Sequence, residues 1–519
     1  MASQPEAYTR DLQTYSTDWT NQVGVYSEAW RYYRGTILDK LADNSDSLLY
    51  PLRLNLIKHI CRKHALFLWG QYEKTRIVRF VVHAPRQQLD ADHKQHANEL
   101  SRLYWDFLRT NQGVTLLREL GRIYMVLGGA VLKTRYAKTA KLGVALEAIS
   151  PEYFYPVWDP ANYSRLLRAH VCYPLHVDQA TLLYGYAKTN GDPGQQVNYL
   201  ETWDETQWSA WVGWEGRWQA ARDRVSGQEL AGTNLLRDPV TMLPRLPFTY
   251  IPRMRTGSFY GDSLVLDLRG LQNELNARLA DAGDAMTQAS HPGGWAHDIR
   301  KKGRGPIQIN SAEILDLGDT PPGGQSPHVE QFPPPDLTTG STELTNKLEK
   351  LLYDLSSVSP VMNGEDEGSQ RSSATLAMRA LPTLTQTDDY RANWSEGLLD
   401  AAHAFLCTCL AYGGLCGVTD ADFAYEVEIA YAPVLPRDRM ETADEIAKLR
   451  PAGAMSQERS IRLQSDVEDV EAELALVQEE DQKKFDRQQA VKAASQPPPG
   501  SKPAGNPAAG KPAGAATKE

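Results

Sequence analysis

The 519-residue chain has few cysteines, no long hydrophobic run and no excess of positive charge. Its five cysteines are too few for a disulfide framework, and their odd number favours a reducing compartment. The opening residues, MASQPEAYTRD, lack the basic-then-apolar pattern of a secretory signal. The most apolar stretch, residues 124–132, is far shorter than the roughly 20 residues that cross a bilayer. We therefore expect a protein made and kept in a cytoplasm, without membrane contact.

The charge balance also excludes some partners. The chain carries 55 basic and 65 acidic residues, a formal net charge of −10. A protein that holds on to DNA needs a basic face to displace the counterions of the phosphates, so tight DNA binding is not expected. Many enzymes carry a similar negative charge, and the balance alone does not select a class.

Motifs for nucleotide or metal chemistry are missing or weak. The sequence has no G-x-x-x-x-G-K-[ST] loop, because GRG at 303–305 lacks the following Lys-Ser/Thr that would hold phosphate and magnesium. His403, Cys407, Cys409 and Cys416 suggest zinc, but Cys407 and Cys409 lie two apart on an expected helix and point to different faces. The surrounding apolar sequence favours cysteines packed in a core. We expect no metal and no cofactor.

A tryptophan-rich block in the middle of the chain has two interpretations. It could form the sugar-binding platform of a hydrolase, or an aromatic hairpin that packs into a domain; its members are Trp203, Trp208, Trp211, Trp214 and Trp218. The neighbouring acids Asp204 and Glu205 fall in an expected turn, where carboxylates commonly accept local hydrogen bonds. The hairpin is favoured, and the hydrolase remains the alternative.

The pattern of apolar residues changes near residue 255. Before it, helices at 51–70 and 101–129 precede strands at 130–158 and 199–221, which indicates a mixed α/β region. After it, 262–290 is expected to form one long helix, followed by a Gly/Pro-rich module with short strands at PIQIN and EILDL. Helices are then expected at 341–357 and 372–412, the latter interrupted at Pro382. A strand and two C-terminal helices follow, the first of them opening at Thr442, and a tail rich in Ala, Pro and Gly is expected to be disordered.

The long helix carries a leucine seam at near-heptad spacing, made of Leu264, Leu268, Leu271, Leu275 and Leu279. Such a stripe indicates close packing against other helices. No partner is evident within the helix itself, so we expect the second long helix and neighbouring copies of the chain to cover it.

Seven segments, in this order, resemble the portal proteins of tailed bacteriophages. The resemblance covers roughly residues 20–485 and is carried by EAWRYYRG, RLNLIKHICRKHALFLWG, LGGAVLKTRYA, AISPEYFYPVWD, GDSLVLDLRGLQNELNARLAD, SSVSPVMNGEDEGSQRSSATLAMRALPTL and AYAPVLPRDRMETADEIAKLRPAGAMSQERSI. It implies an α+β portal fold with a mixed α/β wing, a long-helix stem, a small α/β clip, a helical crown and a disordered C-terminal tail.

The resemblance also implies boundaries for these parts. They are 1–257 for the N-terminal wing, 258–290 for the stem helix, 291–340 for the clip, 341–358 for the second stem helix, 359–371 for the tunnel loop, 372–436 for the kinked helix and wing return strand, 437–490 for the crown and 491–519 for the tail. A portal is a ring, typically of twelve subunits, at one capsid vertex. An acidic bore in such a ring would repel phosphates and let DNA slide.

The partners and sites follow from the same resemblance. We expect a virion protein, present in the host cytoplasm during assembly, that contacts the terminase large subunit, a head–tail connector or adaptor, major capsid and scaffolding proteins and, non-specifically, double-stranded DNA. The tunnel-loop residues would be Val361, Met362, Asn363, Glu365, Asp366, Glu367 and Arg371. The basic cluster Arg300, Lys301, Lys302 and Arg304 would contact a partner or DNA from the clip. A scaffold or adaptor without a channel is the third interpretation, after the portal and the hydrolase.

Overall fold

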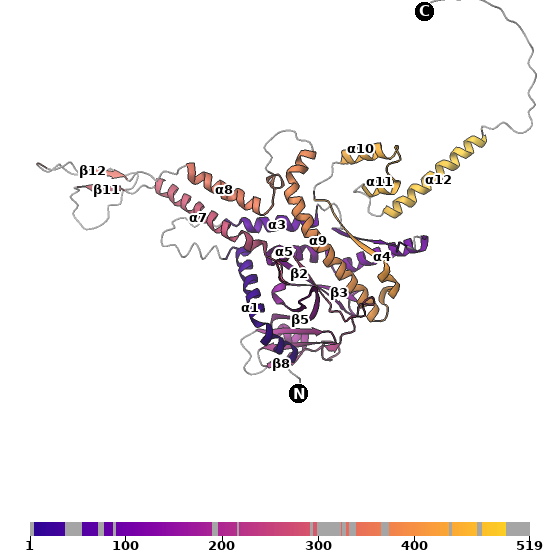
Figure 1. The fold of residues 1–519 in the computed structure, drawn as a ribbon, viewed down its shortest axis with the longest axis horizontal. Helices are drawn as coiled ribbons and strands as arrows, with labels where there is room; N and C mark the ends of the chain where they lie inside the picture. The colour runs from indigo at the N-terminus through magenta and orange to yellow at the C-terminus, as the bar shows by residue number, and fades with distance from the viewer. Residues whose placement is uncertain are drawn as a thin grey trace, which may run out of the picture. The chain divides into compact units, whose positions relative to one another are not determined.

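The computed structural model describes residues 5–36, 54–70, 77–86, 90–188, 196–214, 217–290, 294–297, 323, 328–331, 339–364, 373–434, 439–463 and 470–494 (Figure 1). The chain divides into two compact units, Met1–Leu435 and Pro436–Glu519. Mixed helices and strands in the first unit confirm the α+β fold class.

Among the described residues, the first unit begins with four helices, with one strand, β1 (Val78–His83), between the second and the third: α1 (Glu6–Arg34), α3 (Leu56–Trp69), α4 (Ala91–Thr110) and α5 (Gly113–Leu127). Their apolar faces join one large core together with later helices, and Leu117, Leu120 and Tyr124 of α5 are completely buried in it. Asn55 caps α3 by accepting a hydrogen bond from the Lys58 amide, and Asp90 caps α4 in the same way through the His93 amide. The helices at 51–70 and 101–129 are therefore confirmed, with shifted starts.

A three-stranded antiparallel sheet lies against these helices in the order β10-β2-β3, from β2 (Gly129–Tyr136), β3 (Val144–Ile149) and β10 (Phe248–Pro252). Gly128 ends α5 in the left-handed conformation, with φ of 78°, and an added Cβ there would lie 2.3 Å from the Gly261 carbonyl oxygen. Only glycine fits both the backbone angle and this close approach. The turn thereby sets β2 directly beside the segment that leads into the long helix.

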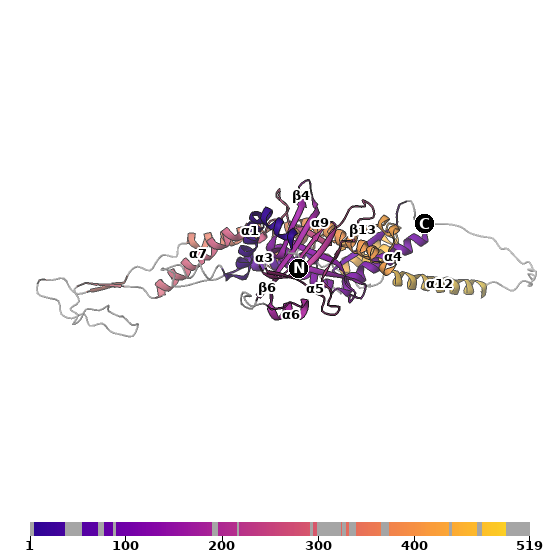
Figure 2. The ribbon, with the colours of Figure 1, turned by 90° about the horizontal axis from the view of Figure 1, so that it is seen from below.

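A second, six-stranded antiparallel sheet runs β4-β5-β6-β7-β8, with β9 also paired to β7 (Figure 2). Its strands are β4 (Phe154–Asp159), β5 (Asn162–His176), β6 (Gln196–Asp204), β7 (Gln207–Trp214), β8 (Arg217–Ala220) and β9 (Ala231–Thr233), and α6 (Val177–Tyr184) follows β5. The strands expected at 130–158 and 199–221 are confirmed. A separate antiparallel pair joins β1 (Val78–His83) to β13 (Glu426–Tyr431), two strands that are far apart in the sequence.

The long helices follow the sheets in sequence. Helix α7 (Leu264–Ser290) packs beside α8 (Thr339–Leu355), and β11 (Gly294–His297) pairs with β12 (His328–Gln331) between them in the chain. Helix α9 (Ser373–Ala411) runs through Pro382 as one helix, where we expected an interruption. The short strands expected at PIQIN and EILDL lie outside the described residues.

The second unit contains α10 (Arg439–Leu449), α11 (Gln457–Leu463) and α12 (Val470–Ala494). The expected start at Thr442 is wrong, because α10 already begins at Arg439. Where we expected a second helix around residues 463–477, the described residues form α11 and α12. Helix α12 extends four residues into the segment expected to be disordered, since its Gln-, Lys- and Ala-rich end favours a helix. The rest of that tail lies outside the described residues.

Candidate functional site

The leucine seam of α7 is covered by the chain itself. Leu264, Leu268 and Leu275 are at most 4% exposed, and Leu271 and Leu279 pack partly buried against the same core. Helices α1, α3, α5 and α8 all contact α7. The second long helix covers the seam as we expected, since α8 contacts α7, but our expectation that neighbouring copies must also cover it is wrong, because α1, α3 and α5 of the same chain contact α7 as well.

Polar contacts fix the first half of α7 against the N-terminal helices. The Gln272 side-chain oxygen accepts hydrogen bonds from the amides of Leu56 (2.9 Å) and Ile57 (3.2 Å), two of the free donors at the start of α3. Arg269 pairs with Glu28 of α1 at 2.7 Å. The start of the long helix is thus bound rigidly to the core.

Arg253 makes a second anchor at the junction of β10, α7 and α9. Its guanidinium is buried and pairs with Asp267 at 2.6 Å, donates to the Asp262 carbonyl at 2.6 Å and reaches the Tyr390 hydroxyl at 3.4 Å. Burial alone would lower the pKa of Arg253, but the neighbouring Tyr390 and Asp267 outweigh it and raise that pKa. The cation therefore stays charged inside the core.

The segment between α8 and α9 is held at its base by two hydroxyl groups. Thr383 Oγ1 donates to the Ser357 carbonyl and accepts from the Ser359 amide, both at 2.8 Å, while Ser359 Oγ donates to the Arg379 carbonyl at 2.7 Å. Proline at 382 has no N–H for the preceding turn of α9. The Ser359 side chain thus donates a hydrogen bond to the backbone of α9 at Arg379, three residues before this proline.

Two residues of α3 hold the same segment from the other side. His64 is fully buried with Nε2 2.6 Å from the Ser356 carbonyl, and burial lowers its pKa to about 4, so it stays neutral and donates through Nε2. Lys63 Nζ donates to the Met362 carbonyl at 3.1 Å. Both contacts bridge almost 300 residues of sequence, so no local pattern could have indicated them.

The predicted loop residues are only partly described. Val361, Met362 and Asn363 lie in a short 3₁₀ turn (Pro360–Asn363) that ends at Gly364 in the left-handed conformation. The remaining predicted loop residues, Glu365, Asp366, Glu367 and Arg371, lie outside the described residues, as does the whole basic cluster Arg300, Lys301, Lys302 and Arg304. The structure thus places the start of the loop against the middle of α3 and after the end of α8.

Acidic side chains outnumber basic ones on the two long helices. The acids are Asp267, Glu274, Asp281, Asp284, Glu343, Glu349 and Asp354, and the bases are Arg269, Arg278, Lys347 and Lys350. Arg278 pairs with both Glu274 and Asp281 on α7, at 2.8 and 2.9 Å. The helix pair as a whole remains negative, which disfavours tight binding of phosphate groups.

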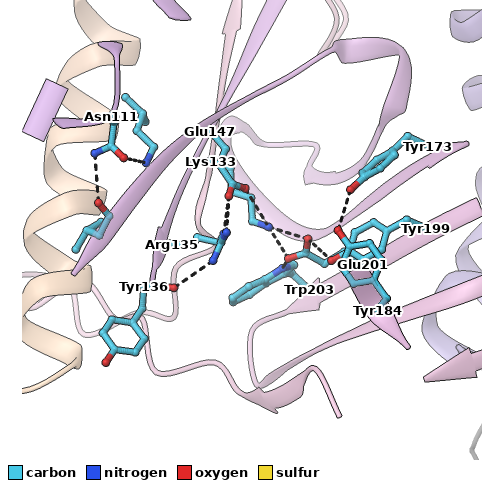
Figure 3. A network of polar contacts seen from close by, with 12 residues as sticks. Asn111, Lys133, Arg135, Tyr136, Glu147, Tyr173, Tyr184, Tyr199, Glu201 and Trp203 are labelled. Atoms are coloured by element: carbon cyan, nitrogen blue, oxygen red, sulfur yellow. Dashed lines mark hydrogen bonds and ion pairs between the residues drawn. The ribbon is translucent and has the colours of Figure 1, made fainter. Parts of the chain in front are cut away.

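A buried ion pair joins the two large sheets (Figure 3). Lys133 Nζ of β2 lies 2.6 Å and 2.7 Å from the two carboxylate oxygens of Glu201 on β6, and both residues are at most 5% exposed. Trp203 Nε1 and the Tyr199 hydroxyl donate to the same carboxylate. Burial would raise the pKa of Glu201, but the Lys133 charge and these donors lower it instead. The paired, enclosed carboxylate is suited to joining sheets rather than to proton transfer.

A second buried carboxylate ties α1 to the six-stranded sheet. Asp11 is 1% exposed. Its carboxylate accepts two hydrogen bonds from Arg168, at 2.6 and 2.8 Å, and one from His170 Nε2 at 3.0 Å. Burial raises the pKa of Asp11, but hydrogen bonds from His170 and Arg168 outweigh it and bring that pKa to about 2. Burial also lowers the pKa of His170, against the opposing contact with Asp11, so the ring is neutral in the fold.

The pKa shifts of Asp11 and His170 both make the folded chain less stable as the pH falls. The ionised Asp11 contributes fully above its ordinary pKa of 3.8, and its contribution is lost as the pH falls towards 2. Because the His170 ring is neutral in the folded chain, its protonation in the unfolded chain below about pH 6.5 lowers the free energy of unfolding further. We expect Asp11→Asn to lower the free energy of unfolding by about 2 kcal/mol at pH 7 and by roughly half as much near pH 3. Urea unfolding at the two pH values measures the difference, and Asp178→Asn, at a carboxylate with an 84% exposed side chain, is the control. An equal loss at both pH values would contradict the assignment.

The tryptophan block forms sheet core, as the hairpin interpretation predicted. Trp203 of β6 pairs in register with Trp208 of β7, and their rings stack with centroids 5.2 Å apart. A cavity of about 520 Å³ beside them is lined by these rings, by Trp211 and by the start of α1. Asp204 also lines this cavity. Its carboxylate accepts three hydrogen bonds of 2.7 Å from Thr206 and Gln207, and so it stabilises the turn between β6 and β7. The geometry gives the hydrolase alternative no support.

The cysteines of α9 are packed as predicted, with one exception. Cys407 and Cys409 are at most 1% exposed, and burial raises the pKa of Cys407 to about 12. Cys416 lies after α9, in the short 3₁₀ turn Leu415–Gly417, and is exposed. His403, one helical turn before Cys407 on α9, lies 3.5 Å from Asp238. Within the described ranges, no three such side chains converge as metal ligands.

The described helices include none with the length and apolar character needed to cross a membrane. No curated protein matches the chain. The model of the family described as phage portal protein, SPP1 Gp6-like, matches residues 12–485, which span both long helices, both large sheets and the segment between α8 and α9. This match extends over far more than half of the sequence, so the chain belongs to that phage portal protein family.

Proposed function

We propose that this chain forms a ring of about twelve copies at one vertex of a phage capsid. The ring would be the conduit through which viral DNA is packaged and ejected, and the docking site for the terminase large subunit and a head–tail connector. The observation that carries the proposal is the family match over residues 12–485. The acidic pair of long helices supports it physically, because a lining that repels phosphates leaves DNA free to slide.

Within this proposal the parts of the chain take different positions in the ring. The core helices and sheets up to residue 257 would form the wing, helices α7 and α8 the stem, and residues 291–340 the clip. Residues 359–371 would form the tunnel loop, 372–436 the return to the wing, and 437–490 the crown. The hydroxyl and α3 contacts support a fixed base for the proposed loop, because they hold Ser356–Ser359 and the Met362 carbonyl in place.

A ring predicts a particular mass for the purified protein. We expect the full-length chain to form particles near twelve times 57.9 kDa, with a central hole in negative-stain images. Native mass spectrometry and sedimentation velocity measure the mass independently of shape. A chain that remains a single copy at every concentration and salt level would contradict the proposal.

The proposed loop and clip residues can be tested in a phage that carries the changed gene. Deleting residues 362–368, or reversing the charges of Arg300, Lys301, Lys302 and Arg304, is expected to reduce packaged DNA at least tenfold without preventing ring formation. Reversing Lys138 and Lys141, exposed in the turn between β2 and β3, is the control for charge alone. Normal DNA content in either test variant would remove the corresponding role.

A further inference from the structure

Three segments that are distant in the sequence meet at one side chain, Arg391 of α9. Its guanidinium donates to the carbonyls of Leu68 (3.0 Å) and Phe67 (3.3 Å) at the end of α3, and to the Ala432 carbonyl (2.7 Å) just after β13. The last turn of a helix leaves carbonyls without a bond inside the helix, and a cation there also favours the negative end of the helix dipole. Arg391 therefore binds the end of α3 to the point where the chain leaves β13.

Carbonyl groups and an aromatic ring surround the Arg391 guanidinium. It lies 5.0 Å from the centre of the Tyr431 ring, and the Tyr431 hydroxyl donates to the Arg391 carbonyl at 3.2 Å. Burial lowers the pKa of Arg391, against the opposing effects of Asp388 and Tyr431. Hydrogen bonds weaken steeply when their angles change, so a shift of any one of the three segments weakens the contact of Arg391 with that segment.

Gly70 allows the end of α3 and the exit of β13 to approach each other closely. It follows α3 with φ of 74°, and a Cβ added there would overlap the carbonyl group of Ala432. Any side chain at this position would therefore force the chain after β13 away from α3. Val434, two residues after Ala432, is buried, and the first compact unit ends at the next residue, Leu435. The contact with α3 thus lies at the very end of that unit.

The two helices that meet at Arg391 also hold the segment between α8 and α9. On α3, His64 contacts the Ser356 carbonyl at 2.6 Å and lies one helical turn before the carbonyls that Arg391 binds. On α9, Thr383 accepts a hydrogen bond from the Ser359 amide at 2.8 Å and lies about 12 Å along the helix from Arg391. A helix is stiff over so short a distance, so a displacement at one end reaches the other.

We propose that Arg391 is a clamp that couples the segment between α8 and α9 to the chain that leaves β13, with α3 and α9 as the rigid connections. When residues 356–362 shift, the two helices move at Arg391, its bond to the Ala432 carbonyl weakens and the exit of β13 is released. The second compact unit begins at Pro436, so the clamp acts on the chain that leads into it. In the proposed ring, on which this last step rests, the clamp connects the tunnel loop to the crown.

Amide hydrogen exchange of the full-length chain tests the coupling, because a coupling between two places must act in both directions. Arg391→Met removes the clamp at one end, and Thr383→Val removes the hydroxyl at the other. We expect Arg391→Met to speed exchange about tenfold or more in residues 356–364, and Thr383→Val to do the same in residues 427–434. Arg391→Lys keeps the charge without the fork of donors and should give a smaller effect in the same direction. Where Arg391→Met does not fold, Arg391→Lys takes its place.

Asn393→Ala is the matched control on the same helix. It also removes a side-chain hydrogen bond to a carbonyl, that of Arg253 at 2.8 Å, but this carbonyl belongs to neither α3 nor the exit of β13. We expect it to leave exchange in both peptides unchanged. Exchange in residues 117–126 of α5, whose core side chains are completely buried, reports general opening and should stay constant in every variant.

Faster exchange at the distant peptide in both directions, with α5 and the control unchanged, supports the coupling. Exchange that rises only beside the changed residue overturns it. Exchange that rises equally in α5, or as much with Asn393→Ala, shows a general loss of stability and also overturns it. Particle mass measured on the same samples separates this result from the proposed function. Ring mass with purely local effects overturns the coupling alone, whereas single-copy mass with effects in both directions overturns the ring and supports the coupling.

Discussion

Replacing Lys133 by methionine alone is expected to lower the free energy of unfolding by about 3–5 kcal/mol. The change leaves the Glu201 carboxylate enclosed, at 5% exposure, without the ammonium group that lies 2.6 Å from it. The remaining donors, Trp203 Nε1 and the Tyr199 hydroxyl, are neutral and cannot compensate for the lost charge. Urea unfolding followed by tryptophan fluorescence measures the loss, because Trp203 contacts the changed site directly.

Two further variants distinguish the cost of leaving a buried charge unpaired from the cost of losing an exposed ion pair. Replacing both partners, by Lys133→Met and Glu201→Leu, removes both charges and is expected to recover part of the lost stability, because Trp203 Nε1 and the Tyr199 hydroxyl then lose their acceptor. Arg135→Met, two residues along the same strand, breaks the ion pair with Glu147, in which both side chains are about 40% exposed. Because water screens that pair, we expect a loss below about 1 kcal/mol. A double variant as unstable as Lys133→Met would contradict the explanation.

Strong periodicity made much of this fold predictable. The heptad leucines of α7 and the alternating strands from Ala130 to Trp158 appear in the structure close to where their spacing placed them. Helix α1 was missed because its stripe is aromatic and polar: Trp19, Tyr26 and Tyr33 recur every seven residues among threonines and serines, which are weak helix formers. The seven-residue spacing of these rings is the signal that could have found it.

Strand β5 was missed because it contains Pro174 and several basic residues, a pattern typical of loops. The structure explains the proline. Strand β4 pairs with β5 only as far as Val171, so Pro174 lies where that edge of the strand has no partner and needs no N–H. Such tolerance depends on which strands are neighbours, and the sequence of one strand does not contain that information.

The candidate sites were less predictable than the elements that carry them. Lys133 and Glu201 are 68 residues apart, and each resembles an ordinary surface residue of an amphipathic strand until the two sheets are packed together. The leucines of α7 and α8 present the reverse difficulty, because periodicity identifies an apolar stripe without identifying its partner. Burial assigns the α7 seam to the chain's own core and leaves Leu344, Leu351 and Leu355 of α8 exposed.

Removing the Asp267 carboxylate, by Asp267→Ala, is expected to cost about 3 kcal/mol. Its partner Arg253 is buried between β10, α7 and α9, so the change leaves a guanidinium without a counterion inside the core. The same carboxylate lies in the first turn of α7, where it also favours the positive end of the helix dipole. Urea unfolding in dilute solution, where sedimentation shows single copies, measures the loss without a contribution from assembly.

Asp281→Ala supplies a matched control on the same helix. The side chains of Asp267 and Asp281 are 53% and 55% exposed, but Arg278, the partner of Asp281, is 42% exposed, whereas Arg253 is 4% exposed. The two variants therefore remove equally accessible carboxylates and differ in the cation left behind: Arg253 is buried, whereas Arg278 is partly exposed and keeps Glu274 as a partner. We expect Asp281→Ala to cost less than about 1 kcal/mol, and Arg253→Met combined with Asp267→Ala to be more stable than Asp267→Ala alone. Equal losses from the two aspartate variants would show that the buried guanidinium is compensated by the Asp262 carbonyl and Tyr390, and that the start of the long helix does not depend on this ion pair.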